Sequence, residues 1–191
     1  NVLRERKKRP HKPFAVMAAD ISTAKRFCKV PAAAEKLLLS ASAPVVILET
    51  KPDEILKSGL PLEFITPDAT TMGVMLPCSP LHKLLAAPLE GDPVPAFDML
   101  VMTSGNRRGE PICISDSEAN ERLKDVADFI LCHNREINLR NDDSVCVVRN
   151  SRPGVWRRAR GYSPDAVYLQ QKMKRCVLAM GAEWKNTIAI G

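Results

Sequence analysis

Short apolar runs and amphipathic segments alternate along this chain, and proline and glycine residues separate them. The pattern predicts strands at 14–17, 44–48, 72–76, 98–103, 128–132, 145–148 and 177–180. It predicts helices at 2–9, 22–27, 32–39, 81–87 and 116–124, and a loop at 61–71. Helices and strands that alternate in this way favour an α/β fold in which the helices pack on a sheet.

The strand predicted at 98–103 has the strongest signal, because Met99–Met102 are four consecutive apolar residues. Such a run is typical of a central strand that is covered on both faces. The strand ends in a polar turn, Thr103-Ser104-Gly105-Asn106. Ligands of open α/β sheets bind beyond the carboxyl ends of central strands, so a binding site is predicted at this turn. A turn that merely reverses the chain is the alternative.

The charge of the chain indicates what such a site would bind. The net charge is +6, and one group of basic residues falls within the first thirteen positions: Arg4, Arg6, Lys7, Lys8, Arg9 and Lys12. A second group follows near the other end, at Arg157, Arg158 and Arg160. Basic clusters favour a phosphate-bearing partner, with a solvated charged segment as the alternative. The sequence has neither a P-loop nor a Rossmann fingerprint.

Composition narrows the class of protein further. Hydrophobic residues are 45% and charged residues 26% of the 191 positions, which is ordinary for globular domains. No apolar run approaches the roughly 18 residues that a membrane-spanning helix needs. The charged first residues lack the apolar core of a signal peptide, so a cytoplasmic protein is expected.

The six cysteines show no spacing typical of a zinc site or of a secreted disulfide framework. Cys132 and Cys146 lie in apolar runs, where cysteine acts as a small hydrophobic residue, and both are expected to be structural. His82 and His133 are expected to make structural hydrogen bonds. No metal site is therefore predicted.

Several motifs together resemble one family. They are Lys7-Lys8-Arg9-Pro10 with Lys12-Pro13-Phe14, Gly73-Val74-Met75-Leu76-Pro77, Thr103-Ser104-Gly105-Asn106 with Gly109-Glu110-Pro111, His133-Asn134-Arg135, Asp142-Asp143-Ser144, and Arg157-Arg158-Ala159-Arg160-Gly161-Tyr162. In this order they resemble the YrdC-like domain of HypF-type carbamoyltransferases, which mature NiFe hydrogenases. The resemblance implies a YrdC-like twisted mixed sheet with packed helices at residues 1–165. Family members also have strands and a glycine-rich loop before this segment, so a domain truncated at its N-terminus is expected.

The tail extends the resemblance. Residues 176–187 resemble the first strand and turn of the next domain in this family, an actin-like ATPase-fold module that transfers the carbamoyl group. The resemblance therefore implies a linker at 166–175 and the start of a second domain at 176–191.

The resemblance implies a sequence of reactions. In the family, carbamate released from carbamoyl phosphate is joined to ATP as carbamoyl adenylate, and the carbamoyl group then passes to the C-terminal cysteine of the partner HypE. ATP is implied as a substrate with Mg²⁺, while zinc belongs to a region outside this chain.

The resemblance also implies site residues. The K-x-R motif of the family falls on Lys7 and Arg9, and its S-x-N motif on Ser104 and Asn106. By similarity, the ATP and carbamate pocket would be completed by Lys12, Thr103, Ser115 and Ser144, together with Arg158 or Arg160. Cations suit this chemistry, because two anions must approach each other and pyrophosphate must leave.

Two other functions stay open. Synthases of threonylcarbamoyl adenylate for tRNA modification share K-x-R and S-x-N, but the tail at 176–187 and the Arg-Arg-Ala-Arg-Gly-Tyr signature favour the HypF type. A double-stranded RNA-binding module would use the basic surface by charge alone. Only nine aromatic residues are present, so stacking on single-stranded bases is poorly supported.

Overall fold

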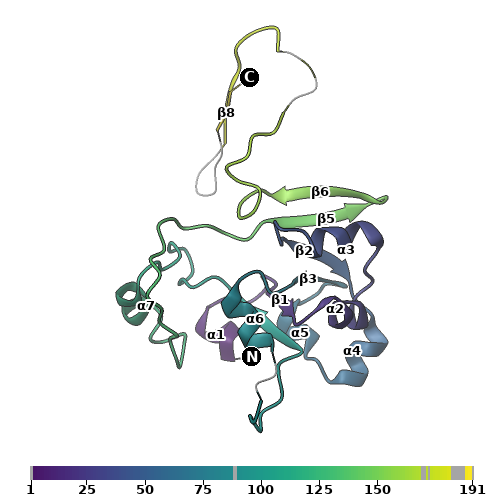
Figure 1. Ribbon diagram of the computed structural model, residues 1–191, viewed down its shortest axis with the longest axis vertical. Helices are drawn as coiled ribbons and strands as arrows, with labels where there is room; N and C mark the ends of the chain where they lie inside the picture. The colour runs from purple at the N-terminus through teal and green to yellow at the C-terminus, as the bar shows by residue number, and fades with distance from the viewer. Residues whose placement is uncertain (1, 88–89, 169–170, 172, 182–187, 191) are drawn as a thin grey trace.

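A six-stranded mixed sheet forms the centre of the computed structural model, which describes residues 2–87, 90–168, 171, 173–181 and 188–190 (Figure 1). The strands are β1 (Ala15–Ala18), β2 (Val45–Glu49), β3 (Thr71–Met75), β4 (Met99–Met102), β5 (Val145–Arg149) and β6 (Arg152–Arg157), in the spatial order β4-β1-β3-β2-β5-β6. Strand β1 is parallel to β3, and β2 is parallel to β5, whereas the other neighbouring pairs are antiparallel. The predicted α/β fold with a mixed sheet is confirmed.

The described part of the chain also contains seven short helices. They are α1 (Val2–Arg6), α2 (Ile21–Phe27), α3 (Ala32–Leu38), α4 (Pro52–Ser58), α5 (Leu62–Ile65), α6 (Pro80–Ala86) and α7 (Asp116–Arg122). Local signals explain where several begin: the Asp20 carboxylate caps α2 by accepting from the Thr23 amide, and Ser79 caps α6 in the same way. Among the described residues, no helix has the length and apolar character needed to cross a membrane.

Side chains of the strands alternate between two apolar clusters, one on each face of the sheet. Val16 of β1 packs in the larger cluster, with Phe27 of α2 and Leu38 of α3. Met17, the next residue of β1, packs in the smaller cluster with Val45 and other residues of the opposite face. This two-residue period is the expected result of pleated strands that are buried on both sides.

Strand β4 exists where it was predicted, but its place in the sheet differs from the prediction. It lies at the edge, pairs with β1 in the described part of the chain, and leaves Val101 41% exposed. The expectation of a central strand covered on both faces was therefore wrong. The interior positions belong to β1, β3, β2 and β5, and of these β1 and β3 are buried over almost their whole length.

Other boundaries also differ from the prediction. No strand forms at 128–132, where Phe129 is 94% exposed, because the described structure brings no partner strand alongside it. Cys132, expected to be structural there, is exposed, whereas Cys146, for which the same was expected, is buried. Helix α4 and strand β6 were not predicted, and α5 lies within the predicted loop at 61–71.

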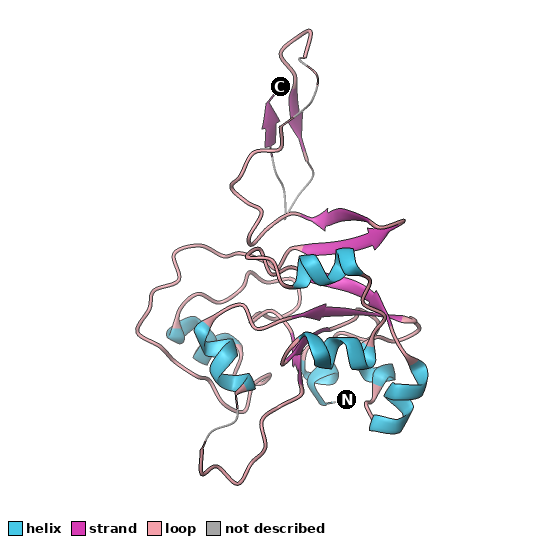
Figure 2. Ribbon diagram, turned by 45° about the vertical axis from the view of Figure 1, so that its right-hand side comes forward, coloured by secondary structure: helices cyan, strands magenta, loops and turns pink. Residues whose placement is uncertain are grey.

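The tail forms a separate two-stranded antiparallel hairpin of β7 (Leu178–Met180) and β8 (Ile188–Ile190). Figure 2 shows this hairpin standing apart from the six-stranded sheet. The strand predicted at 177–180 is confirmed. The expected second-domain segment at 176–191 is described at 176–181 and 188–190, and its remaining residues lie outside the described part of the chain.

Candidate functional site

The end of helix α1 places two basic side chains of the K-x-R motif beside one cavity. The amide of Lys8 donates to the carbonyl of Glu5 at 2.9 Å, and the amide of Arg9 donates to that of Arg4 at 3.0 Å. This pair of bonds is a Schellman motif, in which the residue after the helix adopts a left-handed conformation. Lys8 does so, with φ of 48°. The chain therefore turns sharply between Lys7 and Arg9, and both side chains reach the same cavity.

The S-x-N turn after β4 is held by its own side chains. The hydroxyl of Ser104 donates to Oδ1 of Asn106 at 2.8 Å, and Nδ2 of Asn106 donates to the carbonyl of Glu110 at 2.7 Å. The amide of Cys113 donates to the carbonyl of Gly105 at 2.8 Å. These bonds fix the Ser104 and Asn106 side chains before any ligand is present, as a preorganised site requires.

Lys7 joins the two motifs across 97 positions of sequence. Its ammonium donates to the carbonyl of Ser104 at 2.8 Å, and to the carbonyl and Oδ1 of Asn106 at 2.5 and 3.2 Å. An ammonium has three hydrogens, so these three acceptors use all of its donors. Lys7 therefore acts as the tie that holds the S-x-N turn against the end of α1.

Arg9 is held less completely. Its guanidinium donates from Nε to the carbonyl of Lys12 at 3.1 Å, from Nη1 to the hydroxyl of Thr103 at 3.3 Å, and from Nη2 to the carbonyl of Pro13. It also stacks over the ring of Phe14, 4.7 Å from the ring centroid. A guanidinium has five N–H donors, so two have no partner in the part of the chain that the structure describes and remain for a ligand.

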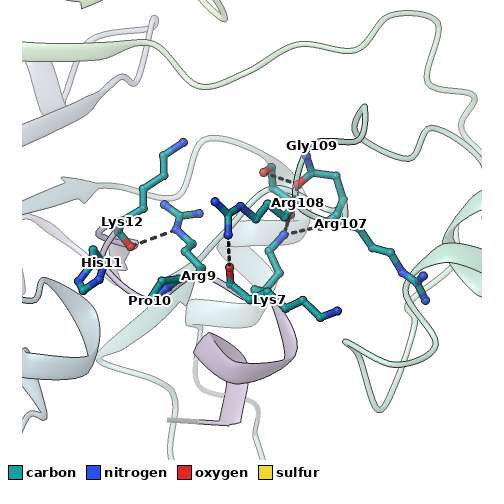
Figure 3. A pocket seen from close by; sticks show the side chains of 11 residues that line it. Lys7, Arg9, Pro10, His11, Lys12, Arg107, Arg108 and Gly109 are labelled. Atoms are coloured by element: carbon teal, nitrogen blue, oxygen red, sulfur yellow. Dashed lines mark hydrogen bonds between the residues drawn. The ribbon is translucent and has the colours of Figure 1, made fainter.

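These segments enclose a cavity of about 340 Å³ (Figure 3). Six of its eleven lining residues are lysine or arginine, and none is Asp or Glu: Lys7, Lys8, Arg9, Pro10, His11, Lys12, Ser104, Asn106, Arg107, Arg108 and Gly109. An excess of fixed positive charge with hydroxyl and amide groups beside it is the composition of an anion-binding site.

The pKa values of Lys7 and Arg9 reflect the close approach of positive charges in this cavity. Burial lowers the pKa of the Lys7 ammonium, and the positive charge of Arg9 lowers it further. Burial also lowers the pKa of Arg9, together with the charges of Arg4 and Arg157. A bound anion would relieve both effects, because it offsets the repulsion between these cations.

The structure thus brings together six of the residues implied by the resemblance. Lys7, Arg9, Lys12, Ser104 and Asn106 line the cavity, and Thr103 contacts Arg9. The sequence-based reading missed other lining residues, Lys8, His11, Arg107 and Arg108, although they lie next to the two motifs.

Arg4 is a further residue that the sequence-based reading missed. Its buried guanidinium donates to the carbonyls of Arg9 at 2.5 Å, Lys12 at 3.1 Å and Phe64 at 2.7 Å. It therefore fixes the segment that carries Arg9. Arg4 is one of several charged residues in the predicted helix, and nothing in the sequence indicated that it would be buried and hold this segment.

Besides Thr103, four implied residues lie outside the cavity lining: Ser115, Ser144, Arg158 and Arg160. Ser115 caps helix α7 by accepting from the amide of Glu118 at 3.2 Å, and it lines a second cavity of about 390 Å³. The buried hydroxyl of Ser144 accepts from the amide of Ala159 at 2.8 Å and donates to the carbonyl of Arg160 at 2.9 Å. Ser144 thus supports the basic segment rather than facing the first cavity.

The arginines of that segment are held by protein groups. Arg160 contacts Oδ1 of Asp143 at 2.8 Å and the carbonyl of Ala43 at 3.0 Å, and Arg158 donates to the carbonyl of Asp165. Arg157 donates to the carbonyl of Asp143 at 2.8 Å. The second basic cluster therefore lies close enough to act on Arg9 by charge, while its members do not line the first cavity.

The same residues offer little to a metal ion. Within the described ranges, no three His, Cys, Asp or Glu residues gather as a metal site, and the first cavity has no carboxylate in its lining. Mg²⁺ prefers oxygen ligands and keeps several waters when it accompanies phosphates. The lining does not supply a protein ligand set for that ion.

Fold and cavity together define an α/β domain with a preorganised anion site between the end of α1 and the turn after β4. A family model described as telomere recombination, which covers Sua5, YciO and YrdC, matches residues 1–159, so the chain belongs to this family.

Within it, the chain is similar to HypF proteins. The carbamoyltransferase HypF of Synechocystis sp. is 40% identical over 188 residues, which cover 98% of this chain and 23% of that protein. The crystal structure of a full-length HypF in its phosphate- and nucleotide-bound form has 42% identity and a TM-score of 0.80, and the match covers 99% of this chain and 23% of that one. The resemblance to HypF-type carbamoyltransferases is thus confirmed, and the chain spans about a quarter of the length of these relatives.

A more distant structure shares the fold alone. Sua5 of P. abyssi, solved in complex with L-threonine, is 19% identical with a TM-score of 0.61, and the match covers 82% of this chain and 43% of Sua5.

Proposed function

We propose that this chain is the adenylate-forming part of a HypF-type carbamoyltransferase. In this proposal it joins carbamate, derived from carbamoyl phosphate, to ATP as carbamoyl adenylate, and the carbamoyl group later passes to the C-terminal cysteine of HypE. The observation that carries the proposal is the carboxylate-free basic cavity, lined by Arg9, in which Lys7 holds the Ser104–Asn106 turn against the end of α1. Similarity to a HypF structure solved with phosphate and nucleotide supports ATP as the substrate.

The reaction depends on charge stabilisation and on positioning of the reactants more than on general acid–base catalysis. A carbamate oxygen attacks the α-phosphorus of ATP, the bond from that phosphorus to the β-bridging oxygen breaks, and the electron pair leaves with pyrophosphate. Carbamate is already an anion, so no proton has to be removed. The barrier comes from the approach of two anions and from the charge that grows on the leaving group.

The side chains divide these tasks between them. Arg9 keeps two N–H donors for phosphate oxygens, and its planar group can bind two oxygens at once. Lys7 is the positioning residue, since all three of its donors hold the turn. Ser104 and Asn106 then orient the carbamate and the α-phosphate.

Carbamate-dependent exchange of labelled pyrophosphate into ATP tests this proposal. The chain supplied with ammonium carbamate should catalyse exchange, and Lys7→Ala and Arg9→Ala should each reduce it by about 10- to 100-fold, as expected for a lost charge-assisted contact. Arg152→Ala is the matched control, because it also removes one positive charge but lies exposed on β6, outside the cavity lining. Melting temperatures of all variants separate loss of chemistry from loss of fold.

Three outcomes would contradict parts of the proposal. Wild-type exchange in both cavity variants would remove these residues from the mechanism. Exchange that requires threonine with bicarbonate instead of carbamate would favour a threonylcarbamoyl adenylate synthase. Tight binding of duplex RNA without any exchange would favour the RNA-binding alternative, with the steep salt dependence of charge-driven binding.

A further inference from the structure

Two adjacent arginines in the turn after β4 differ in what holds them. Arg107 donates from Nε to the carbonyl of Arg122 at 2.6 Å, and its Nη2 contacts the carboxylate of Asp125 at 2.6 Å. Its guanidinium is therefore committed to the α7 region. In the described part of the chain, Arg108 makes one hydrogen bond, from Nη1 to the carbonyl of Lys8 at 3.4 Å, and no ion pair.

The two side chains also point in different directions. Figure 3 shows the guanidinium of Arg108 reaching across the cavity toward Arg9, whereas Arg107 points away from it. The Arg108 side chain is exposed and spans the cavity to the opposite wall at Lys8, 100 positions earlier in the sequence. Turning the Arg108 side chain toward a ligand costs little free energy, since only one long hydrogen bond holds it in the described structure.

Repulsion makes this position unfavourable in the absence of an anion. Arg108 adds a sixth cation to a lining that has no carboxylate. Lys7 and Arg9 are buried or half-buried and already carry protein acceptors, so they leave few donors for a ligand with many oxygens. Arg108, at the exposed rim, has five N–H donors in a fork that suits phosphate, and only one of them is used, in the long bond to Lys8 in the described part of the chain.

We propose that Arg108 binds the outer phosphates of a nucleoside triphosphate, the β and γ groups that leave as pyrophosphate. This inference rests on the proposed function, in which Ser104 and Asn106 orient the reacting α-phosphate. The triphosphate then extends outward, and its terminal groups lie at the rim between Arg108 and Lys8. Arg108 therefore distinguishes triphosphates and pyrophosphate from a nucleoside monophosphate.

Calorimetric titration of the chain with ATP, AMP and pyrophosphate tests the inference. Arg108→Ala should weaken binding of ATP and of pyrophosphate by about 10- to 100-fold, and should change AMP binding by less than about twofold. Arg108→Lys should fall between the wild type and the alanine variant, because it keeps the charge but loses the fork. Arg152→Ala, with the same loss of charge at an exposed position of β6, should bind all three ligands as the wild type does.

The results separate the inference from the function on which it rests. Unchanged binding of ATP and pyrophosphate by Arg108→Ala, or an equal loss for AMP, would overturn the inference and leave the proposed function standing. Binding of pyrophosphate but not ATP by the wild type, with dependence on Arg108, would support the anion contact and contradict the proposed function. Failure of the wild type to bind either ligand would overturn both.

Discussion

Gly161 closes the segment that carries the second basic cluster, and replacing it should destabilise the fold more than any ordinary glycine substitution. Its φ is +80°, and a Cβ atom there would lie 2.5 Å from the carbonyl oxygen of Ser42, 2.6 Å from its Cα and 2.9 Å from its carbonyl carbon. All three are backbone atoms, so no flexible side chain can move aside. The hydrogen bond from the Ser42 hydroxyl to the carbonyl of Gly161, 2.9 Å long, would be disturbed as well.

The expected magnitude has two parts. A left-handed conformation costs a residue with a side chain about 1 to 2 kcal/mol, and overpacking against fixed atoms costs about 1 to 3 kcal/mol more. Gly59→Ala isolates the first part, because Gly59 has φ of +69° at the end of α4 and open space where its Cβ would lie. At about 2 to 4 °C per kcal/mol for a chain of this size, Gly161→Ala should melt about 2 to 12 °C below Gly59→Ala.

Thermal and urea unfolding, followed by circular dichroism, measure this difference. Both variants should unfold in one transition with similar denaturant dependence, so that the midpoints can be compared. Equal destabilisation by the two substitutions would refute the reasoning, since it would mean that the segment at 157–161 does not pack against Ser42 as closely as described.

Two further substitution and labelling experiments test other parts of the structure. Lys8→Gly should raise the melting temperature by about 2 to 4 °C, because glycine accepts the left-handed conformation at the end of α1 at no steric cost; a lower melting temperature would contradict the Schellman geometry. Burial raises the pKa of the Cys28 thiol to about 12, so iodoacetamide at pH 8 should label exposed Cys176 while Cys28 stays unmodified until the chain unfolds or the pH approaches 12. Equal labelling rates in the native state would show that Cys28 is accessible.

The hydrophobic pattern predicted most elements, because each element shows in its own sequence which of its residues are to be buried. Strands β1, β2, β3 and β5 form within a residue or two of the predicted positions. The pattern could not assign order within the sheet: Met99–Met102 is as apolar as an interior strand but lies at the edge. It also predicted a strand around Phe129, where apolar residues occur without a partner strand in the described structure.

The candidate site was predictable only in part, for a similar reason. Residue types pointed to the basic cluster and the polar turn, and the resemblance to the family's motifs singled out Lys7, Arg9, Ser104 and Asn106, whose polar groups do meet. Spacing could not show that Ser144 would be buried beneath the segment at 159–160, or that Arg4 would hold the loop of Arg9. Both depend on contacts between distant segments, which no local pattern records.

The tie made by Lys7 has a consequence for the order of folding. Its acceptors lie 97 and 99 positions later in the chain, so the bonds form only after a long loop has been closed. Contacts between residues so far apart in the sequence form late and slow folding. Helix α1 and the turn after β4 can each form and break locally before that. A chain that has collapsed without completing this closure has no cavity for an anion. Any ligand of the cavity therefore binds only the completed fold. Such a ligand shifts the equilibrium between late intermediates and the native state toward the native state, and the shift grows with ligand concentration.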